Sequence, residues 1–272
     1  MIEKLKYLDA ITLLEEIPTE GHSPLLVIAN DFSAYYIKNT KGHHPAYFLI
    51  NEFICHYLLK IWGIVTPEIA VVTIDKNLLD VALSQFHKLH FYENITFGSK
   101  KIEEAQEMNE LSRIHSKPDF NKLKEPMDFL KIALFDIWVE NTDRKPTNPN
   151  LLFEIKDNKL GAVAIDHAFA FDSQAYENLY KEGVTQAYNE NLLEHLYVKE
   201  IVKHLKMDAT KVDMLNEYYY FCIENTQKHY DEIAQNIPVE LGFTADIKAA
   251  LSDFLFNSKR NKLVFTEFCS RL

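Results

Sequence analysis

Residues 127–140 restrict the fold more than any other segment, because they are apolar on nearly every face of a helix. The apolar side chains are those of Met127, Phe129, Leu130, Ile132, Leu134, Phe135, Ile137 and Trp138. A helix with one apolar stripe can lie at a surface, whereas a helix that is apolar all round must be covered from every side. The chain therefore has to build a core around this helix, and its 272 residues are enough to do so.

Strand patterns dominate the first third of the chain. Short apolar or β-branched runs predict strands over residues 25–29, 34–37, 67–74, 79–83 and 94–97, and the turn after the first run predicts a hairpin. Residues 47–62 have helical periodicity, and Gly63 follows as a C-cap. From about Glu103 onward helix dominates. We therefore expect an α+β protein with a β-rich N-terminal lobe (1–102) and a helical C-terminal lobe (103–272), together one domain.

Composition removes several classes of function. Glycine is scarce, at 7 of 272 residues, and no G-x-G or G-x-x-x-x-G-K spacing occurs, so a nucleotide site built on a glycine run is excluded. The formal net charge of −11 disfavours general binding to nucleic acid. Cys55, Cys222 and Cys269 are too far apart for a disulfide framework or a C-x-x-C zinc site. Without a signal-peptide pattern or a membrane-length apolar run, we expect a cytoplasmic protein with no membrane partner.

A polar loop and a second hairpin follow the apolar helix directly. Residues 151–155 and 160–165 predict two strands, because residues 156–159 between them are turn formers. Pairing around this turn places Ile155 opposite Leu160, and continues until Asn150 lies opposite Ile165. The two ends of the hairpin therefore converge.

This convergence brings Asn148 and Asn150 close to Asp166, with Asp143 in the loop just before the first strand. Magnesium-dependent phosphoryl transfer needs such a set, because one carboxylate (Asp143) accepts the proton of the attacking hydroxyl while a carboxylate (Asp166) and an amide oxygen (Asn148) hold Mg²⁺. Asn150 is the alternative amide ligand. The simpler alternative is a polar loop with a capping aspartate and turn asparagines.

The spacing Asp143-x-x-x-x-Asn148, followed by a hairpin and Asp166, resembles the protein kinases and their relatives. The peptides Asn-Thr-Asp-Arg, Asn-Pro-Asn-Leu-Leu and Ile-Asp-His within residues 141–167 resemble the HipA-like kinase family, and the Asp-Arg pair is similar to the loop of phosphatidylinositol kinases. Four further segments, residues 21–26, 35–38, 51–55 and 63–67, resemble the same family in order, as does the strand at 97–100 that would enter the hinge. The resemblance covers roughly residues 20–170.

The resemblance implies a two-lobed protein-kinase-like fold that uses ATP and Mg²⁺. It implies that Lys38 contacts the α- and β-phosphates and is held by Glu52, with Asp143 as the base and Asn148 and Asp166 as metal ligands. The nucleotide would also meet the short turn of Gly21, His22 and Ser23, and the backbone of Gly98, Ser99 and Lys100 up to Ile102. Arg144 and His167 are accessory or structural residues.

We therefore expect a kinase that transfers the γ-phosphoryl group to a Ser or Thr hydroxyl of a protein. Two alternatives remain open at this point: a small-molecule or lipid acceptor, and a non-catalytic module that senses nucleotide or docks a partner. The resemblance also permits a toxin role with a small antitoxin-like partner. A hydrolase is disfavoured, because the sequence Gly-His-Ser-Pro-Leu at 21–25 lacks the last glycine of a G-x-S-x-G elbow.

Overall fold

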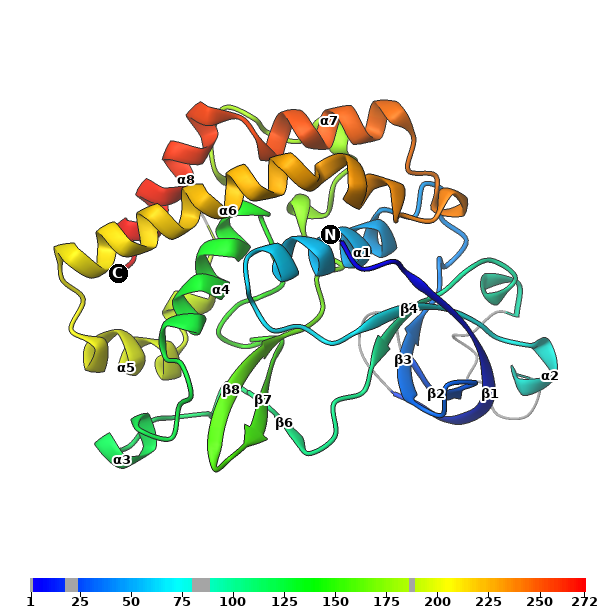
Figure 1. Cartoon of the computed structure of the whole chain (residues 1–272), viewed down its shortest axis with the longest axis horizontal. Helices are drawn as coiled ribbons and strands as arrows, with labels where there is room; N and C mark the ends of the chain where they lie inside the picture. Colours follow the sequence, from blue (N-terminus) through cyan, green and yellow to red (C-terminus); the bar gives the residue numbers. More distant parts are fainter. Residues whose placement is uncertain (1, 18–23, 80–88, 186–188) are drawn as a thin grey trace.

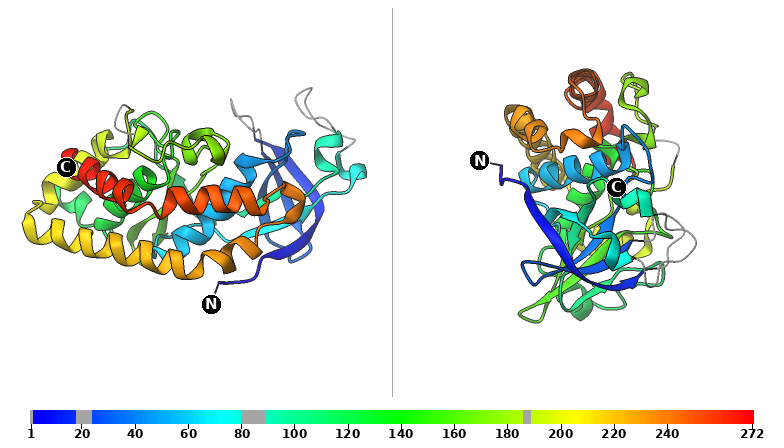
Figure 2. Two further views of the ribbon diagram at one scale, coloured as in Figure 1. Left: turned by 90° about the horizontal axis from the view of Figure 1, so that it is seen from above. Right: turned by 90° about the vertical axis from the view of Figure 1, so that its right-hand side faces the viewer.

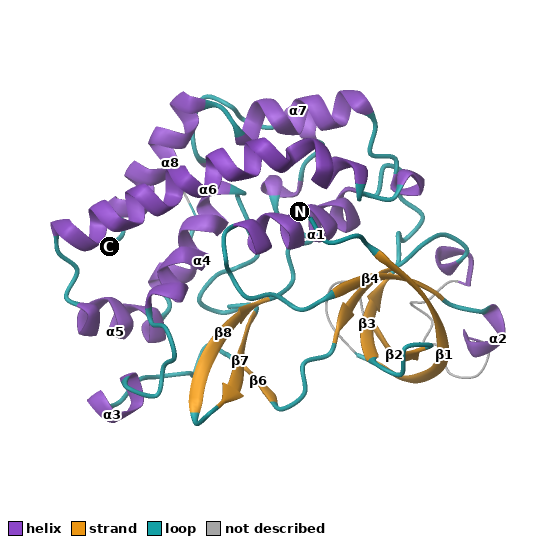
Figure 3. Cartoon of the chain, in the orientation of Figure 1, coloured by secondary structure: helices purple, strands orange, loops and turns teal. Residues whose placement is uncertain are grey.

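The computed structural model describes residues 2–17, 24–79, 89–185 and 189–272 (Figure 1). Its strands are β1 (Lys6–Glu16), β2 (Leu25–Ala29), β3 (Ala34–Lys38), β4 (Ile69–Thr73), β5 (Phe97–Lys100), β6 (Ala105–Glu107), β7 (Leu151–Lys156) and β8 (Lys159–Ala164). Its α-helices are α1 (Tyr47–Ile61), α2 (Lys76–Leu79), α3 (Lys117–Phe120), α4 (Met127–Trp138), α5 (Leu196–Leu205), α6 (Ala209–Gln235), α7 (Ala245–Leu255) and α8 (Ser258–Ser270). The strands form two sheets, and helices and loops make up the remainder (Figure 3).

The first five strands close into a small barrel in the order β1-β2-β3-β5-β4. β2 and β3 form the predicted hairpin, with Leu25 opposite Ile37. β1 pairs antiparallel with β2 and parallel with β4, which closes the ring. The interior is a separate apolar cluster that includes Val27, Tyr35 and Val72. Closure leaves no open edge, so the strand that carries Lys38 is paired on both sides.

The predicted helix at residues 47–62 is α1, and Gly63 follows it with a φ of +66°, as a helix C-cap requires. Eleven of the 15 residues of α1 are buried. The helix lies beside α6 (Figures 1 and 2), and its apolar side chains join the large core of the C-terminal helices. At its end, the ring of Trp62 stacks on Trp138 of α4 with centroids 4.9 Å apart.

The all-round apolar segment forms α4, and nine of its 12 residues are buried, as predicted. It leads into the small sheet β6-β7-β8. The hairpin β7–β8 has the predicted register, with Ile155 opposite Leu160. Ile165 donates its backbone N–H to the carbonyl of Asn150 at 3.2 Å, so the two ends of the hairpin do converge.

Some local predictions were wrong. Leu79 ends the short helix α2 instead of beginning a strand, and residues 80–83 lie outside the described residues. The strand predicted at 94–97 begins only at Phe97. β1 and β6 were not predicted, because β1 buries only Ala10 and β6 buries none of its residues, so neither shows an apolar alternation. In the described part of the chain, no helix combines the length and the apolar character needed to cross a membrane.

Candidate active site

Lys38, Glu52 and Asp166 form a cluster where the barrel meets the rest of the molecule. The Lys38 Nζ lies 2.6 Å from Glu52 Oε1 and 2.9 Å from Asp166 Oδ1. Lys38 ends β3, Glu52 lies on α1, and Asp166 follows β8. The side chains of Lys38 and Glu52 are 11% and 5% exposed, whereas Asp166 is 33% exposed. Asp166 is therefore the member of the cluster that solvent, or a ligand, can reach most readily.

Burial and charge act in opposite directions on Lys38. Burial lowers the pKa of Lys38, but the carboxylates of Asp166 and Glu52 raise it by more, so the ammonium is held in its charged form. Burial is also the largest influence on Glu52 and raises its pKa above the ordinary value, although the nearby Lys38 pulls it down. The cluster therefore depends on the positive charge of Lys38.

α1 also holds the segment that follows Asp166. Glu52 Oε2 accepts the backbone N–H of His167 at 3.0 Å. The Asn51 side chain donates to the carbonyls of Ala168 and Ala170 at 2.8 and 2.9 Å. Tyr176 donates its hydroxyl to Asn51 Oδ1 at 2.6 Å. Two neighbouring polar residues of one helix therefore fix both the lysine and the backbone beside Asp166.

Both candidate asparagines contact Asp143. Asn150 Nδ2 donates to the carboxylate Oδ2 of Asp143 at 3.0 Å, and Asn148 Nδ2 lies 3.5 Å from the Asp143 carbonyl. Asn150 and Asp166 both have left-handed backbones, with φ of 45° and 55°. Such a conformation is uncommon outside glycine but is best tolerated by Asn and Asp. Both asparagines thus bond through their amide nitrogens, and Asn150 orients the proposed base. The Oδ1 of either residue could be an oxygen ligand for a cation.

Arg144 joins these segments. Its side chain is fully buried, and its Nη1 donates to the carbonyls of Pro149, at 2.9 Å, and of Asn150. Its Nη2 donates to the Ile165 carbonyl at 3.0 Å and lies 2.9 Å from His167 Nε2. Its Nε forms an ion pair with Asp136 Oδ2 at 2.7 Å.

Asp136 was missed from the sequence, although a signal exists. It is a carboxylate within the helix that is otherwise apolar all round, and it is 1% exposed. A buried charge needs a partner, so its presence there predicts a cation nearby. Burial raises the pKa of Asp136, and the charge of Arg144 lowers it in part. Burial and the adjacent Arg144 also hold the pKa of His167 well below its usual value, which keeps the ring neutral.

The remaining predicted nucleotide contacts fall in two places. Gly21, His22 and Ser23 lie outside the described residues. Gly98, Ser99 and Lys100 form β5, which pairs with β3 on one side and β4 on the other. The backbone N–H groups of Lys100 and Lys101 are bonded to the carbonyls of Glu68 and Ala34. The contact of residues 98–100 with a nucleotide base stays a prediction.

The donor set suits a magnesium ion that is held partly by phosphates. Asp166 and Asn148 offer a carboxylate and an amide oxygen, which are the hard ligands that Mg²⁺ prefers. Within the described ranges, no group of three or more His, Cys, Asp or Glu side chains is placed to hold a metal by itself.

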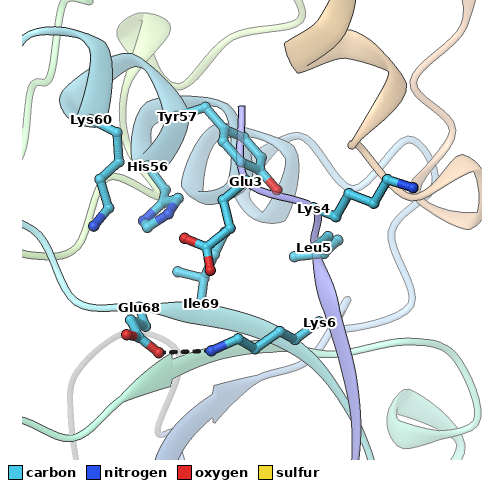
Figure 4. A pocket seen from close by; sticks show the side chains of 9 residues that line it. All are labelled: Glu3, Lys4, Leu5, Lys6, His56, Tyr57, Lys60, Glu68 and Ile69. Carbon is cyan, nitrogen blue, oxygen red and sulfur yellow. Dashed lines mark hydrogen bonds and ion pairs between the residues drawn. The ribbon is translucent and has the colours of Figure 1, made fainter. Parts of the chain in front are cut away.

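A small pocket lies elsewhere, between the segment before β1, α1 and β4 (Figure 4). Its lining consists of Glu3, Lys4, Leu5, Lys6, His56, Tyr57, Lys60, Glu68 and Ile69. Burial lowers the pKa of His56, one of the lining residues, to about 3. The cavity of about 20 Å³ has room for a water-sized group, far below the several hundred Å³ of a nucleotide site. It is therefore not the nucleotide site.

A family model described as HipA-like kinase matches residues 12–264, which is most of the chain. The chain belongs to the HipA-like kinase family. The family predicted from the motifs is thereby confirmed. The matched range spans the barrel, the polar loop and most of the helical region that follows. Comparison with curated protein sequences finds no match.

Solved structures give the fold of this HipA-like kinase. The Helicobacter pylori proinflammatory kinase CtkA is similar with a TM-score of 0.53 and 14% identity, over 96% of this chain and 98% of that one. HipA in the Shewanella oneidensis complex with HipB and operator DNA gives a TM-score of 0.36 at 12% identity, covering 87% and 57%. The Golgi casein kinase with Mn/ADP gives 0.39 at 11% identity, covering 99% and 73%. The predicted α+β, kinase-like fold is confirmed.

Proposed function

We propose that this HipA-like kinase transfers the γ-phosphoryl group of ATP, with Mg²⁺, to a Ser or Thr hydroxyl of a protein. The observation that carries the proposal is the cluster in which Lys38 bridges Glu52 and Asp166 at 2.6 and 2.9 Å. The Lys38 ammonium is held in place by the buried Glu52 and by Asp166, the partly exposed carboxylate that is the proposed metal ligand. That combination suits a triphosphate better than it suits a neutral ligand.

Asp143 is the proposed base. Its carboxylate is oriented by Asn150 and would accept the proton of the acceptor hydroxyl as the oxygen attacks the γ-phosphorus. The bond from the γ-phosphorus to the bridging oxygen breaks, and ADP leaves with that oxygen. Lys38 holds the α- and β-phosphates, and Asn148 and Asp166 would hold the metal. Bound Mg²⁺ supplies charge neutralisation on the phosphates.

No glycine-rich loop is needed for this arrangement. The chain has only 7 glycines, so the phosphates must be held by Lys38, the cation and the short turn proposed at residues 21–23. Membership of the HipA-like kinase family supports a protein acceptor over a small-molecule acceptor. The experiment below distinguishes the two.

Replacing the proposed base tests the proposal directly. Asp143→Ala should abolish phosphoryl transfer, by at least about 100-fold as for loss of a general base, while Mg-ATP still raises the melting temperature. Asp213→Ala, at an exposed position on α6, is the matched control and should behave as wild type. Transfer is measured with γ-labelled ATP, and mass spectrometry of the labelled protein identifies the acceptor residue.

Two results would contradict the proposal. Wild-type protein that shows no thermal shift with Mg-ATP lacks the nucleotide site. Wild-type protein that binds Mg-ATP but neither labels itself nor turns ATP over would be a nucleotide-sensing module instead.

A further inference from the structure

Arg144 is fully buried beside the proposed active site, with hydrogen bonds from both Nη atoms and an ion pair from Nε. A guanidinium has five N–H donors in one rigid plane, and here they face Asp136, three backbone carbonyls and the ring of His167. Because a guanidinium nitrogen can only donate, His167 Nε2 must accept, so the ring carries its proton on Nδ1. Burying the guanidinium charge costs desolvation free energy. Its contacts offset that cost only when the acceptors are held in this geometry.

The bonded backbone atoms lie next to the proposed catalytic groups in the chain. Asp143 directly precedes Arg144. Asn148 precedes Pro149, whose carbonyl Arg144 holds at 2.9 Å. Asp166 stands between Ile165, whose carbonyl Arg144 holds at 3.0 Å, and His167. One side chain thus contacts all the backbone segments that carry the base and the metal ligands.

We propose that Arg144 is the positioning residue for phosphoryl transfer, with Asp136 of α4 as its anchor. This proposal rests on the proposed function. Arg144 sets how far the Asp143 carboxylate lies from Asp166, because it ties the loop, the start of β7 and the end of β8 to one rigid plane. Within the described residues it makes no hydrogen bond or ion pair with Lys38 or Glu52, so the Lys38–Glu52 ion pair does not depend directly on it.

The test is Arg144→Lys, which keeps the charge but cannot reach these acceptors at once. Turnover of Mg-ATP per folded molecule should fall about 100-fold, the cost of a displacement of about 1 Å, and KM for ATP should change by much less than kcat. Amide hydrogen exchange should become faster in both 142–150 and 164–168 and stay unchanged in α6. A residue that only stabilised the fold would lower the folded fraction and leave kcat per folded molecule as it was.

Arg260→Lys is the matched control. Arg260 is equally buried, and it bonds the Trp138 carbonyl at 2.8 Å and Glu140 at 3.1 Å, outside the segments that Arg144 joins. We expect it to lose stability and to keep kcat per folded molecule. If Arg144→Lys does not fold, Asp136→Asn tests the same proposal, because it keeps the shape of the anchor and removes its charge.

Three outcomes would separate the possibilities. Unchanged kcat in folded Arg144→Lys, or faster exchange confined to the residues around 144, overturns the positioning role. A wild-type protein that does not turn ATP over overturns the proposed function instead. In that case hydrogen exchange still tests whether Arg144 holds the two segments together. Faster exchange in both segments of Arg144→Lys supports this, and unchanged exchange overturns it.

Discussion

Lys38 bridges two carboxylates, of which Glu52 is buried and Asp166 is partly exposed. Lys38→Met leaves Glu52 and Asp166 without their shared cation. Breaking a buried pair in this way costs about 3–5 kcal/mol, so we expect a loss of that size in the free energy of unfolding at neutral pH. The measurement is urea unfolding of the variant and the wild type at several pH values.

The pH dependence of this variant has a definite sign. Without Lys38, the pKa of Glu52 rises further above its ordinary value, because the lysine charge is what lowers it. The folded variant then binds a proton that the unfolded chain releases. Relative to wild type, it should therefore recover part of its lost stability as pH falls toward the ordinary carboxyl pKa. A difference that stays flat or grows in acid contradicts this expectation, and Lys76→Met, in an exposed ion pair with Glu93, is the control.

At the residue scale, part of the site could be predicted from sequence. The meeting of Asn150 with Ile165 follows from counting back along a hairpin with a clear turn, and the pairing of Lys38 with Glu52 follows from motif order. The role of Arg144 could not be predicted, because its acceptors are backbone carbonyls that no residue type encodes. Its anchor Asp136 was visible only as a charge out of place in an apolar helix.

At the scale of single elements, the elements with strong periodicity were predicted and those without it were not. α1, α4 and the β7–β8 hairpin each bury one side or all sides, so their patterns are plain. β1 is 11 residues long but buries only Ala10, since it lies on the barrel with its other side chains outward or half-covered. Its position is set by its pairing with β2 and with β4, and β4 is distant in the chain. A local sequence pattern cannot show such a pairing.

Gly98 gives β5 a testable packing requirement. A Cβ at this position would lie 2.6 Å from Val72 Cγ2 and 3.2 Å from the Ala70 carbonyl. We expect Gly98→Ala to destabilise the protein by about 1–3 kcal/mol, the range for an overpacked core, and Val72→Ala to relieve part of that loss in the double variant. Thermal unfolding gives both numbers.

Gly161→Ala in β8 is the control for this prediction. An added Cβ there meets nothing closer than 3.9 Å, so it should be nearly neutral. Equal losses at the two glycines, or no coupling between positions 98 and 72, would show that the barrel interior is not as tightly packed as the distances indicate.

At the scale of the whole molecule, the outer side of the barrel joins the core of the helices, while the barrel interior is a second cluster. The large cluster contains α1 and α4 together with Ile69, Val71 and Phe97 from barrel strands. The lobe boundary predicted at residue 102 stays a prediction. α1 precedes this boundary in the sequence, but it packs among the helices that follow it. Sequence patterns cannot show this, since periodicity identifies a buried face but not the element that covers it.

Because the outer side of the barrel joins the core of the helices, we expect a single cooperative unfolding transition. The chain has two tryptophans, Trp62 and Trp138, and they stack on each other inside the large core, so their fluorescence reports on that core alone. Far-UV circular dichroism reports on the helices and the barrel together. We expect the two signals to give the same urea midpoint, as two-state unfolding requires. A barrel that melts earlier by circular dichroism would contradict the expectation.

The burial of α1 has a consequence for how such a protein can be turned on and off. Moving this helix far enough to part Glu52 from Lys38 would bring side chains from its 11 buried positions into water, at about 25 cal/mol for each Å² of apolar surface. The free energy needed to reach a resting state with a displaced α1 would therefore approach the free energy of unfolding of the whole protein. We expect the catalytic constellation to be permanently assembled, so that restraint has to come from what is allowed to reach it: the supply of nucleotide, the availability of the acceptor, or a protein that blocks the entrance.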